Sequence, residues 1–164
     1  MELTVPSLNE AEAAMTSTID LSQFHLFKDI PENVIDEMQK ISRAYSVAKC
    51  ELVSREGVKA DQLHFLINGS IALRVKLTSR PEHVTVSFVS KPYESFGWSG
   101  VVPPYHYTSS AICDEDSQIL AIPGGKFMEI LEKHPESGFI IMRRIAEIIA
   151  DRLRNSRQAL LKTM

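Results

Sequence analysis

The sequence predicts a mainly β protein with flanking helices: a double-stranded β-helix, or jelly roll, with N-terminal helices and a long C-terminal helix. Two observations predict this class. Short apolar runs separated by turn residues fill residues 44–122, and apolar residues at helical spacing flank that block on both sides. A chain of 164 residues that is 44% hydrophobic is long enough for one domain with an ordinary core. We expect residues 1–20 to form an N-terminal segment, either loose or a short helix, and residues 21–164 to form the domain.

The first strong helix signal begins at Ile30-Pro31. Proline suits the first position of a helix, where its missing N–H group has no intrahelical partner to lose. The apolar residues that follow lie three or four positions apart and therefore share one face: Val34, Ile35, Met38 and Ile41. Ahead of this helix, further apolar anchors stand at near-helical spacing: Leu21, Phe24, Leu26 and Phe27.

The central block is expected to form short strands. They contain Tyr45 and Val47, Leu52 and Val53, and residues 62–67, 70–76, 83–90, 107–113 and 118–122. Asn68-Gly69 is typical of a two-residue hairpin and would pair residues 62–67 with residues 70–76. A second turn is expected at Ser79-Arg80-Pro81. Many short strands with regularly spaced turns favour a sandwich or barrel over a parallel sheet.

Helical spacing returns after Pro123-Gly124-Gly125. A short helix that ends near His134-Pro135 carries Phe127, Ile130 and Leu131, and a long helix is expected from about residue 136 to residue 161. One apolar stripe of that long helix contains Phe139, Met142, Ile145, Ile149 and Leu153, and it is widened by Ile141 and Ile148. Because this face is broad, we expect part of it to pack on the roll and part on a partner subunit, as a homodimer. The alternative is that the whole face is internal core.

Composition excludes several classes of protein. The net charge is -3, but basic residues gather from Arg143 onward. A basic helix could contact nucleic acid, yet without a recognised DNA-binding motif a solvated helix face is the favoured interpretation. Cys50 and Cys113 lack metal-type spacing and are read as reduced residues. No apolar run approaches the ~20 residues of a membrane span, and no secretory signal is visible, so we expect a cytoplasmic protein without membrane contact.

Several short sequence motifs follow one another along the chain. They are Leu26 to Pro31, Arg55-Glu56-Gly57, Leu63 to Gly69, Phe96-Gly97, Tyr107 to Cys113, and Phe127 in the following helix. Together they resemble the cyclic-nucleotide-binding domain of bacterial catabolite-activator-type regulators and of kinase regulatory subunits. The resemblance implies a regulatory, non-catalytic domain whose ligand is a cyclic nucleotide or another small molecule. It also implies that residues 96–110, here called the cassette, bind the phosphate, while the long helix caps the base and pairs with its dimer mate.

The cassette departs from the family pattern at two positions. In the family, a glutamate directly after Phe-Gly accepts a hydrogen bond from the ribose, and an arginine about ten residues later pairs with the phosphate. This chain has Trp98 and Tyr107 there. An indole is only a donor, and a phenol carries no countercharge. Losing both contacts weakens cyclic nucleotide binding by roughly two to four powers of ten, unless Arg74 or Lys76 replaces the arginine from a neighbouring strand.

The predicted ligand-binding residues are Phe96, Gly97, Trp98, Ser99, Gly100, Tyr107, Thr108 and Ser109. Rings and hydroxyls in this set suit a neutral or planar ligand. The alternative hypothesis is a degenerate module in which Trp98 and Tyr107 fill the site, so that the protein acts through dimerisation or protein contacts. No helix-turn-helix is expected after the long helix, so the chain is expected to be a sensor module without its usual effector, unless the effector is another protein.

The sequence contains little that supports an enzymatic function. A cupin-like metal enzyme needs clustered imidazoles, but the histidines are scattered: His25, His64, His83, His106 and His134. No nucleophile elbow, P-loop or G-x-G-x-x-G motif occurs, and no catalytic residue is proposed. His64 lies in an apolar strand and is read as a structural histidine with its hydrogen bonds satisfied. Cys113 is read as core packing.

Overall fold

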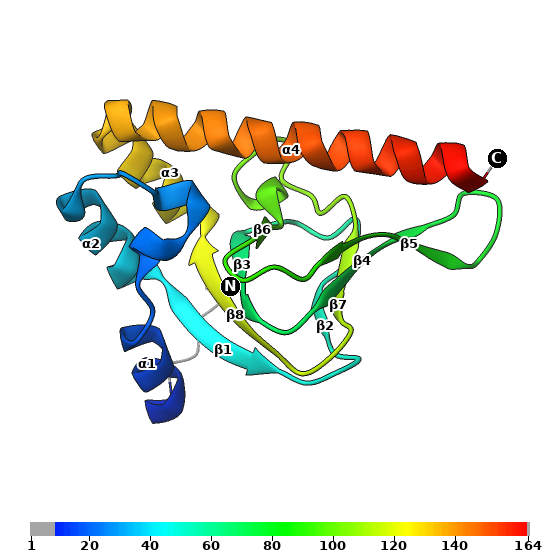
Figure 1. The fold of residues 1–164 in the computed structure, drawn as a ribbon, viewed down its shortest axis with the longest axis horizontal. Coiled ribbons are helices and arrows are strands. Elements are labelled where there is room, and N and C mark those ends of the chain that lie inside the picture. Colours follow the sequence, from blue (N-terminus) through cyan, green and yellow to red (C-terminus); the bar gives the residue numbers. More distant parts are fainter. Residues whose placement is uncertain (1–8, 164) are drawn as a thin grey trace.

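A computed structural model of the chain describes residues 9–163 and contains two antiparallel sheets of four strands each (Figure 1). The first sheet has the order β1-β8-β3-β6, with β1 Arg43–Val47, β8 Ser117–Pro123, β3 Gln62–Asn68 and β6 Ser95–Phe96. The second sheet has the order β2-β7-β4-β5, with β2 Leu52–Ser54, β7 Ser110–Cys113, β4 Ile71–Lys76 and β5 His83–Val89. The predicted mainly β jelly roll with flanking helices is therefore confirmed.

A buried apolar cluster joins the two sheets. Leu66 and Ile119 come from the first sheet and pack with Ile71, Leu73 and Cys113 from the second. These side chains point to the same interior because alternate residues of a strand face the same side. The packing role predicted for Cys113 is confirmed, since its side chain is buried in this cluster.

A second apolar cluster lies where the helices meet the first sheet. It is built on the 3-10 turns η1 Leu21–Gln23 and η2 His25–Phe27 and on the helices α2 Glu32–Ile41 and α3 Gly124–Lys133. Phe24 and Phe65 meet edge to face with centroids 5.3 Å apart, and Phe27 lies 5.6 Å from Phe65. Such ring contacts stabilise a core beyond the area they bury. The apolar anchors predicted ahead of α2 are therefore core residues.

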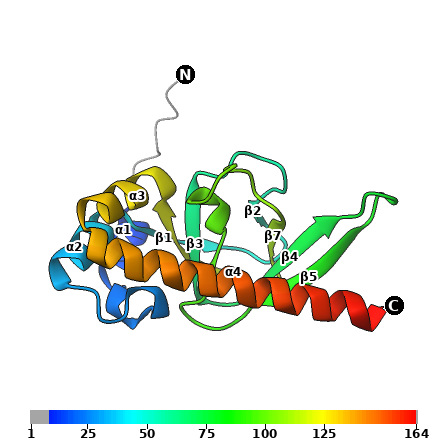
Figure 2. The same cartoon turned by 90° about the horizontal axis from the view of Figure 1, so that it is seen from above.

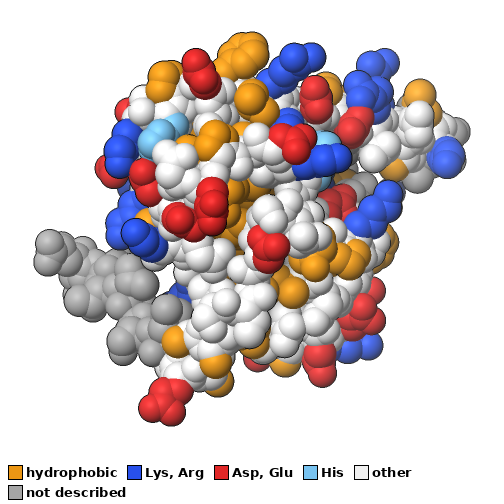
Figure 3. Space-filling view, turned by 60° about the vertical axis from the view of Figure 1, so that its left-hand side comes forward, with side chains coloured by type: hydrophobic (Ala, Val, Ile, Leu, Met, Phe, Trp, Pro, Cys, Tyr) orange, Lys and Arg blue, Asp and Glu red, His pale blue; other side chains and the backbone are white. Residues whose placement is uncertain are grey.

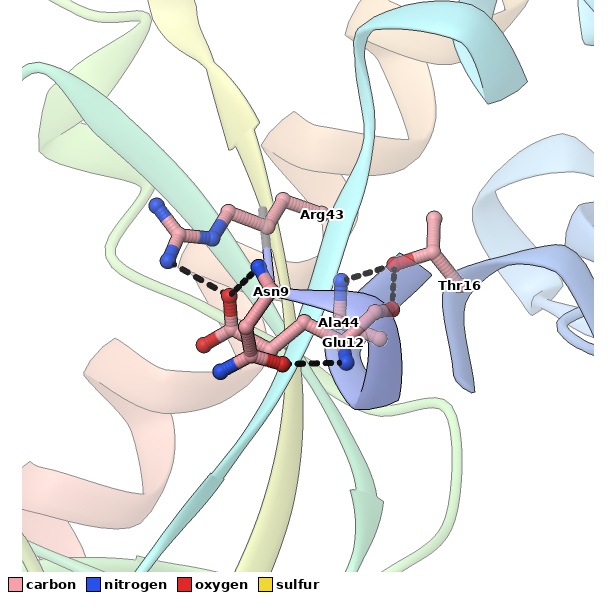
Figure 4. Close-up of polar contacts among 5 residues, drawn as sticks. All are labelled: Asn9, Glu12, Thr16, Arg43 and Ala44. Atoms are coloured by element: carbon pink, nitrogen blue, oxygen red, sulfur yellow. Dashed lines mark hydrogen bonds and ion pairs between the residues drawn. The ribbon is translucent and has the colours of Figure 1, made fainter. Parts of the chain in front are cut away.

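Helix α1, Glu10–Ser17, docks on β1 through a hydrogen bond and an ion pair (Figure 4). The Thr16 hydroxyl donates to the Glu12 carbonyl at 2.7 Å and accepts from the Ala44 amide at 2.8 Å. The Arg43 guanidinium contacts the Glu12 carboxylate at 2.8 Å. Of the two forms expected for the first twenty residues, residues 10–17 therefore adopt the short helix, while residues 1–8 lie outside the described residues.

The hairpin predicted at Asn68-Gly69 is wrong. Strands β3 and β4 belong to different sheets, so the turn carries the chain from one sheet to the other. The reason is local packing against β8. Gly69 has φ of 104°, and a Cβ atom there would lie 2.7 Å from the Ser117 Cα. The Ser70 amide donates to the Ser117 hydroxyl at 3.1 Å, which ties the turn to β8.

The turn at Ser79-Arg80-Pro81 does join a pair, since β4 and β5 are antiparallel neighbours. The strand predicted over residues 107–113 begins later, at Ser110, because residues 105–107 instead bond to the loop at residues 57–60. The short strand β6 was not predicted, since two residues are too few to show alternation.

Helix α4, Pro135–Thr163, lies across the roll and the helical end of the molecule (Figure 2). Its C-terminal part lies beside the β4–β5 hairpin in both ribbon views. Ile141 and Ile145 are buried against the second cluster, whereas Phe139 and Leu153 are 70% and 62% exposed. The alternative in which the whole apolar face is internal core is therefore wrong for this chain.

The basic residues of α4 do not all lie on a solvated face. Arg152 is only 9% exposed, so the solvated interpretation is wrong at this position. Arg144 donates to the carbonyls of Leu26 and Lys28 at 3.1 and 2.7 Å. Within residues 9–163, no helix is long and apolar enough to cross a bilayer.

Candidate functional site

The cassette lines a small cavity with a volume of about 20 Å³. This space holds about one water molecule. Strand β6 contributes Phe96, the 3-10 turn η3 Trp98–Gly100 contributes Trp98 and Ser99, and β7 contributes Ala111. The complete lining is Ser54, Leu73, Phe96, Gly97, Trp98, Ser99, Tyr107, Thr108, Ser109 and Ala111.

The structure brings together every predicted ligand-binding residue except Gly100. A Cβ atom on Gly100 would lie 2.7 Å from the Gln62 carbonyl carbon, so this glycine permits close packing of η3 on β3. Ser54, Leu73 and Ala111 line the cavity but were not predicted. The signal available for Ala111 and Leu73 was alternation, because each lies two residues from an inward-facing core residue of its strand.

Gly97 begins η3 in the left-handed region, with φ of 74°. This backbone conformation favours glycine, and space favours it too, since a Cβ atom would lie 2.9 Å from the His64 Nδ1. The first N–H groups of a helical turn have no partner within the turn. The backbone at Trp98 and Ser99 can therefore offer donors to a bound group.

The side chain of His64 packs against Gly97. Its ring is buried and stacks on Phe96 with centroids 5.1 Å apart. Burial lowers the pKa of His64 from 6.5 to about 4, so the ring is neutral at pH 7. The predicted structural role is consistent with this burial, but the expectation that its hydrogen bonds are satisfied is wrong, because Nδ1 has no partner.

Tyr107 also lines the cavity, and its ring centroid lies 6.3 Å from that of His64. Its side chain is buried, and its hydroxyl donates to the Gln62 carbonyl at 3.3 Å. Its backbone is also held, since the Gly57 amide donates to the Tyr107 carbonyl at 2.8 Å. Burial raises the pKa of Tyr107, so the phenol stays neutral and offers no charge to a ligand.

Trp98 lies between the cavity and α4. Its ring is half-buried, packs against the helical core cluster, and carries the Arg152 guanidinium 5.4 Å from its centroid. Arg152 also donates to the Ser95 carbonyl at 2.7 Å and lies 3.5 Å from the Glu94 carboxylate. Burial lowers the pKa of Arg152, and the Glu94 charge opposes that effect. The cassette is therefore tied to α4 through one arginine.

Sequence reasoning did not single out Arg152, although a signal was present. Ile141, Ile145 and Ile148 are spaced four and three residues apart, and Arg152 follows four residues later. That spacing continues the stripe that faces the roll. A long arginine can follow such a stripe because its methylene stem packs on apolar surface.

Neither Arg74 nor Lys76 is among the residues that line the cavity. Leu73 lines it, and the pairing of β4 with β5 shifts register between Leu73 and Arg74. The cassette itself contains no lysine or arginine. The residues that line the cavity therefore include no cationic side chain.

Metal chemistry has no candidate centre in the described part of the chain. Residues 9–163 hold no group of three or more His, Cys, Asp and Glu side chains that could bind a metal ion. The cupin-like enzyme hypothesis thus gains no support from the structure.

Comparison with known proteins identifies the family. A family model described as cyclic nucleotide-binding domain matches residues 45–134, which is more than half of the chain. The chain belongs to the cyclic nucleotide-binding domain family. The match covers most of the strands and the whole cassette. The resemblance inferred from the sequence is therefore confirmed.

Solved structures share this fold. A cyclic nucleotide-binding protein of Geobacter metallireducens is 25% identical, with a TM-score of 0.70 over 87% of this chain and 98% of that one. A cyclic nucleotide-binding domain of Methylobacillus flagellatus has a TM-score of 0.74 at 14% identity, over 88% of this chain and 80% of that one. The catabolite activator protein of Thermus thermophilus has a TM-score of 0.67 at 18% identity, over 82% of this chain and 61% of that one. A search of curated proteins gave no significant match.

Proposed function

We propose that this chain is a non-catalytic regulatory domain, formed by residues 21–164, that senses a small planar ligand of the cyclic nucleotide class in the cassette cavity. The observation that carries the proposal is the convergence of η3, Tyr107, Thr108 and Ser109 on one cavity in a domain of this family. Hydroxyls and backbone amides there can bind a phosphate or a base edge, while the rings can stack on a base.

The affinity expected for a cyclic nucleotide is low. The cassette has neither the carboxylate nor the guanidinium of the family pattern, since Trp98 and Tyr107 stand at those positions. Charge-assisted hydrogen bonds contribute about 1.5–3 kcal/mol each, so a site that would bind at micromolar concentration moves toward millimolar. Selection for cyclic AMP or cyclic GMP then depends on ring stacking and hydroxyl contacts.

Calorimetric titration tests the proposal. Cyclic AMP and cyclic GMP are titrated beside AMP and adenosine, which share the adenine of cyclic AMP but lack the cyclic phosphate. Saturable heat with one cyclic nucleotide, absent with AMP, supports the proposal. The matched variant Thr108→Val should weaken that binding, whereas Thr85→Val, a change of the same kind in β5, should not. No heat with any of the four probes would contradict it.

A closed, ligand-free module is the second candidate, and the size of the cavity favours it. A space of about 20 Å³ is far below the roughly 300–1,000 Å³ of ordinary ligand pockets. In this case Trp98 and Tyr107 are the permanent filling of the site. Trp98→Ala would then lower stability without creating affinity for any nucleotide, which separates the two candidates.

We further propose that α4 pairs with the same helix of a second copy. Phe139, Ala146 and Leu153 recur every seven residues on its exposed side, with Met142 and Ile149 half-buried between them. A seven-residue apolar repeat is typical of a helix seam between subunits. Figure 3 shows apolar side chains projecting along the upper edge of the molecule, where Figure 1 places α4. In sedimentation experiments the wild type should be a dimer and the variant Leu153→Glu a monomer. Equal molecular masses for the two proteins would contradict the proposal.

A further inference from the structure

Arg152 is an unusual residue of α4 because it is charged, buried and only partly bonded. It is 9% exposed, its Nη2 donates to the Ser95 carbonyl at 2.7 Å, and its Nη1 is buried without a partner. Its nearest carboxylate, on Glu94, lies 3.5 Å away. A buried guanidinium with an unpaired N–H group is costly to keep in place. The Arg152 side chain is therefore easily shifted to another conformation.

The ring on which Arg152 rests is also a wall of the cassette cavity. Trp98 lines that cavity and carries the guanidinium 5.4 Å from its centroid. A cavity of about 20 Å³ admits a water molecule but no nucleotide, so a ligand must displace part of the lining. Phe96 and Tyr107 are buried, whereas Trp98 is half-buried on a three-residue turn. Trp98 is the ring in this wall that has solvent to move into.

We propose that the contact between Trp98 and Arg152 is an autoinhibitory latch, which closes the cavity and holds α4 against the cassette. A ligand that displaces Trp98 removes the surface on which Arg152 rests and so releases the C-terminal half of α4. By thermodynamic linkage, the latch weakens ligand binding by the same factor by which the bound ligand weakens the latch. This inference rests on the proposed function, since it needs a ligand in the cavity, but its central contact is testable without one.

Amide hydrogen exchange tests the coupling in the ligand-free protein. Trp98→Leu keeps apolar bulk but removes the ring face, and Arg152→Gln removes the charge. Each should speed exchange of the α4 amides in residues 148–156 about three- to thirty-fold, the range expected for losing a cation–π contact of this kind. The double variant should add little to the Arg152→Gln effect, because Arg152→Gln already removes the contact that Trp98→Leu breaks, together with the hydrogen bond to the Ser95 carbonyl.

The matched control is Arg144→Gln, which removes another arginine of α4 that bonds to backbone carbonyls but does not touch Trp98. It should leave exchange in residues 148–156 unchanged. Exchange in β3 and β8 should stay as in the wild type, which shows that the variants remain folded. The latch would be refuted if the α4 amides of Trp98→Leu exchanged at the wild-type rate while exchange in β3 and β8 also stayed as in the wild type. So would fully additive effects in the double variant.

Titration with cyclic AMP separates the latch from the proposed function. If the latch opposes the ligand, Arg152→Gln binds cyclic AMP about three- to thirty-fold more tightly than the wild type, and Arg144→Gln binds as the wild type does. Weaker binding in Arg152→Gln would refute the latch and leave the proposed function standing. Absence of binding of both cyclic AMP and cyclic GMP in every variant, with the exchange coupling present, would refute the proposed function and leave the coupling of Trp98 to α4 established.

Discussion

The buried histidine beneath the cassette makes the stability of this domain depend on pH in a defined window. His64 is buried, stacked on Phe96 and unpaired at Nδ1. Its pKa is lowered by burial from 6.5 to about 4. Between these values the unfolded chain binds a proton that the folded protein does not, so stability rises with pH. The contribution is complete above about pH 6.5 and is lost as the pH falls toward 4.

The magnitude follows from the two pKa values. Each pH unit between 6.5 and about 4 changes the unfolding free energy by about 1.4 kcal/mol, so the loss across the window is about 3 kcal/mol. This is a large share of the roughly 5–15 kcal/mol by which domains are stable. The chain has a single tryptophan, Trp98, so urea unfolding at a series of pH values is followed by its fluorescence.

The variant His64→Asn removes the titration while keeping a polar group near the Nδ1 position. Its unfolding free energy should fall much less than that of the wild type between pH 6.5 and 4.5. His64→Phe, which keeps a ring to stack on Phe96, provides a second test if the asparagine variant is unstable. His83→Asn, at an exposed site in β5, should follow the wild type. Parallel curves for His64→Asn and the wild type would refute the assignment.

Three further predictions concern local contacts, each measured as a change in unfolding free energy by urea titration. Thr16→Val leaves the Ala44 amide without its acceptor and should cost about 1–2 kcal/mol, whereas an unchanged value would mean that α1 does not depend on this cap. Gly69→Ala puts a Cβ atom against β8 at positive φ and should cost at least 1–3 kcal/mol, and a neutral result would contradict the close approach. Tyr107→Phe removes the hydrogen bond to the Gln62 carbonyl and should cost about 1 kcal/mol, while a stabilised variant would argue against that bond.

Most of the fold was predictable because its signals are local. Alternation marked β4 and β5, and helical spacing marked α2, α3 and α4. The error at Asn68-Gly69 arose because a turn signal gives a change of direction but not the sheet that the next strand joins. That choice was made by contacts with Ser117, which lies far along the chain. Contacts between residues so far apart in the sequence leave no local pattern from which they could be predicted.

The site was predictable to a similar degree. The family resemblance located the cassette, and the structure places Trp98 and Tyr107 in one cavity wall. The resemblance gave no indication of Arg152, because that residue acts through a helix more than fifty positions away from the ring it contacts. Whether Arg74 faced the cavity depended on strand register, which β7 sets by pairing Arg74 with Ser110. The roles of residues that depend on strand register or helix docking are set by contacts between distant parts of the chain, which leave no local sequence pattern.

The most direct test of the account is an NMR titration of nitrogen-15-labelled protein with cyclic AMP. The account predicts that the largest amide shifts occur at Gly97, Ser99, Thr108 and Ser109, with further shifts in α4 near Arg152 as Trp98 leaves its place. The shifts should saturate at millimolar concentration, as expected for a cassette without its charged pair. A spectrum that cyclic AMP and, in a parallel titration, cyclic GMP both leave unchanged, or shifts confined to residues remote from this cavity, would contradict it.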